Sequence, residues 1–388
     1  MSDDDDKVHG FGAHLVNRER RKQAAQQVAQ QQAEQQQAAA QQAAARKHDI
    51  NRTAHFDGAI GYQRWLSAAW SLDGSQVAAG GHNLGAKHGE LEIWNGHTGQ
   101  HEGHSTRHLR HDLAGHVVSL SWAPDNTHLA AIENDPKSGR QVVNIRSQAE
   151  GKRLIGVPAG PRLTQVSWSP DGSQIALSAR DARPVLLVDP GSGQLRRTLE
   201  GVSGPVAWEP GGHRIAAPDG AKVAIFDATT GQRERTIAGQ EHQATAIAWA
   251  TRGKVLAVSD GEHIRVIDAD SGERRWNLPW VTSADDRTDD PSVHYIGWLD
   301  RGRYLIEFRK HDAWSRDEAG TRIGTINLWD VTAHSLFRFL FYETINDRQR
   351  PPAEVLLAPQ GGRQTLLFYD DKTPQVWEIS GDLPGFEP

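Results

Sequence analysis

Short runs of alternating apolar and polar residues, each bounded by turn-forming residues, repeat along most of the chain. The stretch "WSPDGSQIALSARDARPVLLVDPGSGQ" at 168–194 is typical, with two apolar runs separated by Pro-Asp-Gly and closed by Asp-Pro-Gly-Ser-Gly. Alternation with a period of two predicts half-buried β-strands, and Gly, Pro and Asp between the runs predict tight turns. The pattern therefore predicts an all-β fold over residues 51–388.

Seven copies of this unit follow one another. Each copy is marked by a residue, usually Trp, that precedes a Gly or Asn by four positions: Trp70, Trp122, Trp168, Trp208, Trp249, Trp298 and Leu357. The successive spacings are 52, 46, 40, 41, 49 and 59 residues. A period near 40–45 with longer insertions is typical of the four-stranded blades of a propeller. We therefore expect a seven-bladed β-propeller.

The end of the repeat region suggests how such a ring closes. The last copy stops after its third strand, "PQVWEIS" at 374–380, and an alternating piece, "NRTAHFDG" at 51–58, precedes the first copy. A blade with three strands leaves an unpaired edge. We expect residues 53–57 to supply the outer strand of the last blade. A six-bladed ring with a separate piece is the alternative, because the seventh copy is degenerate.

Several short motifs recur at fixed places in the copies. They are Gly115-His116 before Trp122, the Asp219-Gly220 and Asp260-Gly261 turns, and Trp329-Asp330. On these residues the chain, from about residue 51 to the end, resembles the WD-repeat β-propeller family in a divergent, bacterial-type form. The resemblance implies a scaffold that holds partners within a larger assembly.

The first fifty residues have a different composition. Residues 1–10 include Asp3-Asp4-Asp5-Asp6-Lys7, the enterokinase recognition string, and are either the remnant of an expression tag or an acidic tail. Residues 11–50 contain a tract at 17–48 of Ala, Gln, Arg, Lys and Glu, all good helix formers. We expect a polar N-terminal α-helix that connects or weakly oligomerises as a coiled coil; a disordered tract is the alternative, because the segment has no apolar stripe.

Composition excludes several classes of function. The 388 residues contain no cysteine, which excludes disulfides and thiolate chemistry, and the net charge of −6 gives no basic footprint for nucleic acid. No apolar run is long enough to span a membrane. We expect a cytoplasmic protein without cofactors, although a secreted protein without disulfides would have the same composition.

The connections of variable length mark the expected binding face. They lie between second and third strands, or between blades, and these two kinds of connection emerge on one face of a propeller. They are segments 80–89, 134–139, 309–322, 283–293 and 347–353. Insertions collected on one face of a repeat protein usually mark its binding surface.

A tryptophan in a charged segment is the strongest single candidate for that surface, since Trp and Arg dominate interface hot spots. The residues expected to contact a protein or peptide partner are Trp314, Arg309, Lys310, His311, Arg316, Arg287, Arg350, Arg64 and Trp65. The other reading of Trp314 is that it packs against its own blade.

No catalytic motif is present, so we expect a non-enzymatic binding module. One alternative is the sensor domain of a larger bacterial signalling protein. Another is an enzyme or small-ligand binder at the channel mouth, with Arg64, Arg162, His242, Asp285 and Arg350 as candidates. His104, His108 and His111 are weak metal candidates, because they would share one face only if that stretch were helical.

Overall fold

In the computed structural model, the regular secondary structure of the described residues is almost entirely β-strand, as the alternating pattern predicts. The described residues are 50–55, 63–83, 89–100, 115–134, 138–147, 153–159, 162–179, 181, 183–239, 241–278, 292–299, 302–310, 322–344, 354–357, 365–369 and 374–379. Within them no helix is long and apolar enough to cross a membrane. Segment 1–10 and the expected helix at 17–48 lie outside the described residues.

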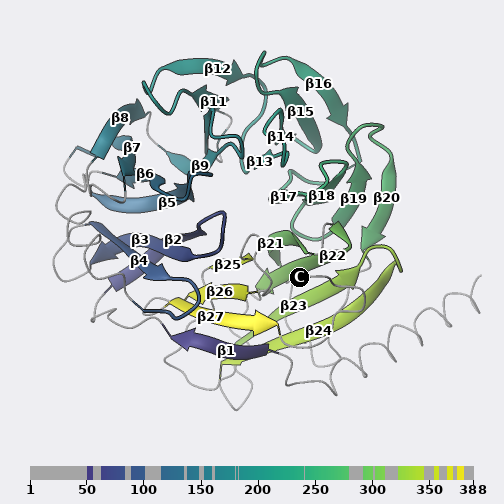
Figure 1. Ribbon diagram of the computed structural model, residues 1–388. Coiled ribbons are helices and arrows are strands. Elements are labelled where there is room, and N and C mark those ends of the chain that lie inside the picture. Colours follow the sequence, from purple (N-terminus) through teal and green to yellow (C-terminus); the bar gives the residue numbers. More distant parts are fainter. Residues whose placement is uncertain are drawn as a thin grey trace, which may run out of the picture.

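The strands of the described residues pair antiparallel into seven sheets, six of four strands and one of three. Figure 1 shows that these sheets follow one another around a common centre in the order of the chain. We number them from the N-terminal side: sheet 1 (β2–β4), sheet 2 (β5–β8), sheet 3 (β9–β12), sheet 4 (β13–β16), sheet 5 (β17–β20), sheet 6 (β21–β24) and sheet 7 (β25–β27 with β1).

Each sheet contributes strands in order from the centre outward. The innermost strands are β2 (Gln63–Trp70), β5 (His116–Trp122), β9 (Leu163–Trp168), β13 (Ala207–Trp208), β17 (Ala246–Trp249), β21 (Ser292–Leu299) and β25 (Glu354–Leu357). The second strands are β3 (Gln76–Asn83), β6 (His128–Asn134), β10 (Ile175–Ala179), β14 (Arg214–Asp219), β18 (Val255–Ser259), β22 (Tyr304–Lys310) and β26 (Thr365–Tyr369). The third strands are β4 (Gly89–Asn95), β7 (Gln141–Ser147), β11 (Val185–Val188), β15 (Lys222–Asp227), β19 (Ile264–Asp268), β23 (Arg322–Asp330) and β27 (Pro374–Ile379). The outermost strands are β8 (Arg153–Ala159), β12 (Leu195–Leu199), β16 (Arg233–Ile237), β20 (Arg274–Leu278), β24 (Ser335–Thr344) and β1 (Ile50–His55).

The outermost strand of sheet 7 comes from the beginning of the repeat region. β1 runs antiparallel to β27, with Ile50 opposite Ile379 and His55 opposite Gln375. The expected closure is therefore confirmed for residues 53–55. The strand begins three residues earlier than expected, and residues 56–57 lie outside the described residues. Pairing this edge joins two parts of the chain that are more than 300 residues apart.

The repeated tryptophans connect neighbouring sheets. The indole Nε1 of each of four of them donates to a backbone carbonyl at the end of the preceding innermost strand. These bonds are Trp122 to Ala69 (3.0 Å), Trp208 to Ser167 (3.2 Å), Trp249 to Ala207 (2.9 Å) and Trp298 to Ala248 (3.0 Å). Each accepting residue directly precedes the previous copy's Trp, so one repeat unit binds the next at a fixed position.

A second series of bonds crosses between innermost strands closer to their beginnings. The residue three positions before the Trp accepts the backbone N–H of the next strand: Ser67 from Leu120 (3.1 Å), Ser119 from Val166 (3.1 Å) and Gln165 from Val206 (2.8 Å). Among the described strands, neighbouring sheets share no backbone ladder, so these side chains satisfy N–H groups that would otherwise be unpaired.

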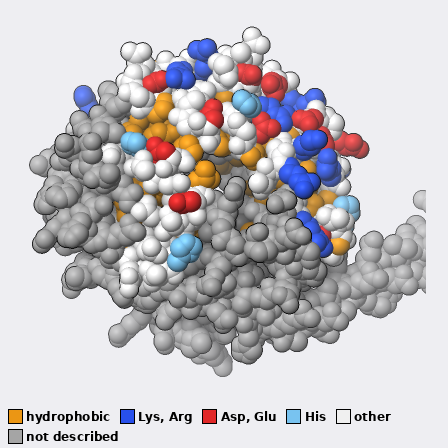
Figure 2. Space-filling view, in the orientation of Figure 1, with side chains coloured by type: hydrophobic (Ala, Val, Ile, Leu, Met, Phe, Trp, Pro, Cys, Tyr) orange, Lys and Arg blue, Asp and Glu red, His pale blue; other side chains and the backbone are white. Residues whose placement is uncertain are grey.

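The hydrophobic core is divided among the spaces between sheets. Between sheets 1 and 2, for example, Ala78, Leu91 and Ile93 pack against Leu129 and Ala131. In Figure 2 the hydrophobic side chains of the described residues lie mainly toward the centre, and most Lys and Arg side chains lie toward the outer edge. Burial between sheets explains why no sheet could be stable alone.

Two turns hold a non-glycine residue where their counterparts have glycine. Asn126 takes the Gly position of the first-to-second-strand turn with φ of 59°, and His334 takes that of the third-to-fourth-strand turn with φ of 52°. His334 stacks on Trp276 of the preceding sheet, with ring centroids 5.2 Å apart. In the two preceding sheet pairs the position of Trp276 is held by Arg197 and Arg235, which donate to Thr230 O and Ser271 O of the following turn.

Candidate functional site

The four indole bonds fix the direction of the sheets relative to one another. They connect residues at the ends of neighbouring innermost strands, so these strands end on the same side of the ring. The first-to-second and third-to-fourth connections therefore lie on one side, which we call the short-turn side. The second-to-third connections and those between sheets lie on the other, the long-connection side. All five variable segments named from the sequence join strand ends on the long-connection side.

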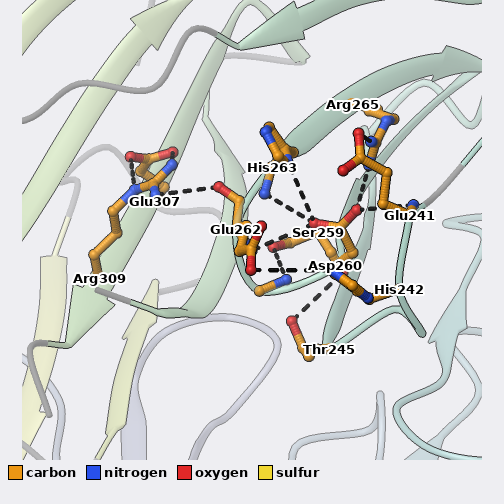
Figure 3. A network of polar contacts seen from close by, with 11 residues as sticks. Glu241, His242, Thr245, Ser259, Asp260, Glu262, His263, Arg265, Glu307 and Arg309 are labelled. Atoms are coloured by element: carbon orange, nitrogen blue, oxygen red, sulfur yellow. Dashed lines mark hydrogen bonds and ion pairs between the residues drawn. The ribbon is translucent and has the colours of Figure 1, made fainter. Parts of the chain in front are cut away.

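A polar cluster of described residues lies on this side, between sheets 5 and 6. Figure 3 shows it around the connection 260–263, which joins β18 to β19. Asp260 is 5% exposed, and Oδ2 of its carboxylate accepts a hydrogen bond from Nη1 of Arg265 at 2.6 Å. The other carboxylate oxygen accepts the backbone N–H of His263 at 2.9 Å.

The charge on Asp260 is stabilised despite its burial. Burial alone would raise the pKa of this carboxyl group, but hydrogen bonds from Arg265 and from the N–H groups of His263 and Glu241 outweigh it and lower the pKa. An ionised Asp260 therefore holds two chain segments together, because Glu241 belongs to the connection between sheets 4 and 5.

Sheet 6 holds the same connection from the opposite side. The backbone N–H of Val293 donates to Gly261 O at 2.7 Å, and Nη1 of Arg309 donates to Glu262 O at 3.3 Å. Arg309 is 1% exposed, and its Nε also donates to Oε1 of Glu307 at 2.7 Å. That oxygen further accepts Nδ2 of Asn327 at 2.5 Å.

The buried groups leave four titratable side chains at the surface of the cluster. Glu241 and His242 are exposed, and Glu262 and His263 are half-buried. Nε2 of His242 lies 4.0 Å from Oε1 of Glu262. Two carboxylates and two imidazoles can form ion pairs and hydrogen bonds with a partner. Among the described residues, no group of His, Asp and Glu is arranged to hold a metal ion.

Comparisons with known proteins do not identify a family for this chain. No protein-family model matches the sequence, and no curated protein matches it.

The residues expected from the sequence are distributed unevenly over the structure. Arg309, expected to contact a partner, is instead buried and bonded to the base of the cluster, so it positions the connection 260–263 and the end of β22. Arg162 is exposed at the start of β9 with φ of 75°, and His242 belongs to the polar cluster. Arg64, Trp65 and Lys310 lie in β2 and β22, but their side chains are outside the described part. The remaining candidates lie outside the described residues: Trp314, His311, Arg316, Arg287, Arg350, Asp285, His104, His108 and His111.

Asp260 and Arg265 did not stand out as site residues in the sequence, although a signal was present. Asp260 belongs to an Asp-Gly turn, and Arg265 interrupts an otherwise apolar strand between Ile264 and Val266. A cation within a buried strand requires a buried partner. The sequence does not say which of the nearby carboxylates supplies it.

Proposed function

We propose that this chain is a seven-bladed β-propeller of the WD-repeat kind that binds a protein or peptide partner without catalysing a reaction. The observation that carries the proposal is the location of the variable connections, whose strand ends all lie on the long-connection side. Binding residues concentrate on loops held by a rigid scaffold. The indole bonds between sheets supply that rigidity.

Within this side, the partner contacts the region above sheets 5 and 6. Glu241 and His242 offer exposed polar groups there, and the Asp260–Arg265 pair holds their segment in place. Buried Arg309 fixes the end of β22, immediately before the segment that carries Trp314. Trp314 is the aromatic anchor of this proposal, in keeping with the role of Trp in hot spots.

Affinity capture from the source organism tests the proposal. The wild-type chain is compared with Glu241→Ala/His242→Ala, with Trp314→Ala, and with a control pair on the short-turn side, Glu273→Ala/Arg274→Ala. The control removes two exposed residues, the acidic Glu273 in the turn after β19 and the basic Arg274 at the start of β20. We expect wild type and control to retain the same partner, and the two long-connection variants to lose it.

The reverse pattern overturns the proposal: retention by both long-connection variants, or loss by the control alone. A variant that lacks residues 1–49 adds a further comparison. If only this truncation loses the partner, binding belongs to the N-terminal segment and not to the ring.

A further inference from the structure

The innermost strands of sheets 1–3 line a cavity of about 370 Å³ on the short-turn half of the ring. It extends along β2, β5 and β9 to the turn residues Leu72, Pro124 and Pro170. This volume lies within the roughly 300–1,000 Å³ range of small-ligand sites. The cavity is separate from the polar cluster, because the two lie toward opposite sides of the ring and on different sheets.

The cavity wall contains hydrogen-bond donors that the protein does not use. Ser67 and Ser119 are 8% and 7% exposed, and each accepts one backbone N–H. Ser121 does the same for the N–H of Trp168 at 2.9 Å. Within the described residues none of these three hydroxyl groups has an acceptor for its own proton. A hydroxyl that already accepts a bond is a stronger donor.

Two other polar side chains of the lining, Gln165 and Ser169, are engaged within the protein. Oε1 of Gln165 accepts both the Val206 N–H at 2.8 Å and the Ser178 hydroxyl at 3.3 Å. The Ser169 hydroxyl donates to Asp171 at 2.6 Å and accepts the Gln174 N–H at 3.0 Å. The unused hydroxyl protons of Ser67, Ser119 and Ser121 thus favour a ligand that brings acceptor oxygens.

The remaining lining is apolar and uncharged. Trp70, Trp122 and Trp168 contribute to the wall, and Leu72 at its mouth is 41% exposed. No Asp, Glu, Lys, Arg or His is among the residues that line the cavity in the described part of the chain. An anion would find no cation there, so the lining favours an uncharged ligand with an apolar surface.

We propose that this cavity binds a short, uncharged, proline-rich peptide segment. Proline carbonyls supply acceptors for the three serine hydroxyls, while proline has no N–H that needs a partner. The proline rings pack against Leu72, Pro124 and the edges of the tryptophans, as in other aromatic-lined sites for such peptides. This second site does not depend on binding at the long-connection side.

The test uses acetyl-tetraproline amide as the probe and acetyl-tetraalanine amide as its N–H-bearing control. Binding is followed by the indole N–H resonances of Trp70, Trp122 and Trp168, assigned by Trp→Phe variants. We expect tetraproline to shift these resonances in a saturable way and tetraalanine to leave them unchanged. Ser121→Ala should weaken the affinity about two- to tenfold, the equivalent of one neutral hydrogen bond.

A pair of variants at exposed leucines separates loss of binding from loss of folding. Leu72→Asp should abolish binding, whereas Leu195→Asp on β12, where the leucine is 57% exposed, should retain it. The proposal is overturned if tetraproline shifts no indole resonance at millimolar concentration, since the cavity then holds water only. Equal shifts from tetraalanine, or unchanged binding by Leu72→Asp, also overturn it.

Discussion

Arg146 and Glu133 form an ion pair in which both side chains are completely buried, with Nη2 of the arginine 2.7 Å from Oε1 of the glutamate. They come from β7 and β6, on the face of sheet 2 that carries Leu129 and Ala131 against sheet 1. Sheet 6 has a comparable buried pair, Arg309 and Glu307, on its face toward sheet 5. These two pairs, with Asp260–Arg265 described above, place buried charges at several positions in the described part of the structure.

Removing one partner of the Arg146–Glu133 pair should be far more destabilising than removing both. Arg146→Met or Glu133→Leu leaves an uncompensated buried charge and should lower the free energy of unfolding by about 3–5 kcal/mol. The double variant replaces the pair with apolar groups and should be close to wild type in stability. Urea denaturation of the four proteins measures these differences. Additive losses in the double variant would contradict this explanation.

The indole bonds predict unequal effects of one substitution at two equivalent positions. Trp208 and Trp70 are both 8% exposed, but only Trp208 donates to the preceding sheet; within the described residues Nε1 of Trp70 has no partner. Trp→Phe removes the same volume at both sites. The loss of stability should be larger for Trp208→Phe by about 0.5–1.5 kcal/mol, the net value of a hydrogen bond. If thermal unfolding shows equal losses of stability for Trp208→Phe and Trp70→Phe, the Trp208 hydrogen bond contributes nothing to stability.

Asp268 should make the stability of the protein depend on pH in the acid range. Hydrogen bonds from Ser271 N–H and from Arg275 lower the pKa of this carboxyl group to about 2. Because the folded-state pKa lies below the unfolded one, its contribution is full above about pH 4 and is lost as the pH falls toward 2.

Asp268→Asn isolates that contribution. Asn95 holds the same place in sheet 1 and accepts the N–H groups of His97 and Thr98 at 3.0 Å, so asparagine preserves the turn. The free energy of unfolding of Asp268→Asn should fall less steeply than that of wild type between pH 4 and pH 2. Urea denaturation at several pH values checks this, and identical slopes would refute it.

The stack of Trp276 on His334 should be energetically coupled. In neighbouring sheet pairs the equivalent residues are Arg and Gly, as in Arg235 and Gly272. Trp276→Arg alone loses the aromatic contact. His334→Gly alone removes the strain of a positive φ at a non-glycine residue, but it also loses the aromatic contact. The double variant recreates the Arg and Gly arrangement and should be more stable than the two single changes predict, by about 0.5–1.5 kcal/mol. A double-mutant cycle with an interaction free energy of zero would show that the two residues are not coupled.

Features that depend on local chemistry were predictable from the sequence. The spacing of the Trp residues predicts the succession of sheets. The alternation after residue 50, together with the missing fourth strand of the last copy, predicts the pairing of β1 with β27. Asn126 lies four residues after Trp122, where most other copies have glycine, and its φ of 59° agrees with that spacing.

The position of charged groups between sheets was not predictable. Arg309 begins a charged stretch in the sequence, which is typical of an exposed loop. In the structure it lies in β22, and its guanidinium donates to a carbonyl 47 residues earlier. Which sheet lies opposite a residue depends on the packing of whole repeat units. No periodicity within one unit encodes that contact, so the sequence alone predicts a surface position for Arg309.

Hydrogen exchange of the captured complex, read by mass spectrometry, tests most directly where recognition occurs. We expect partner-dependent protection at residues 238–245 and 260–263 on the long-connection side, and none at the turns 71–75 and 269–273. Protection confined to those turns, with unchanged exchange at 238–245 and 260–263, would contradict binding at the long-connection side.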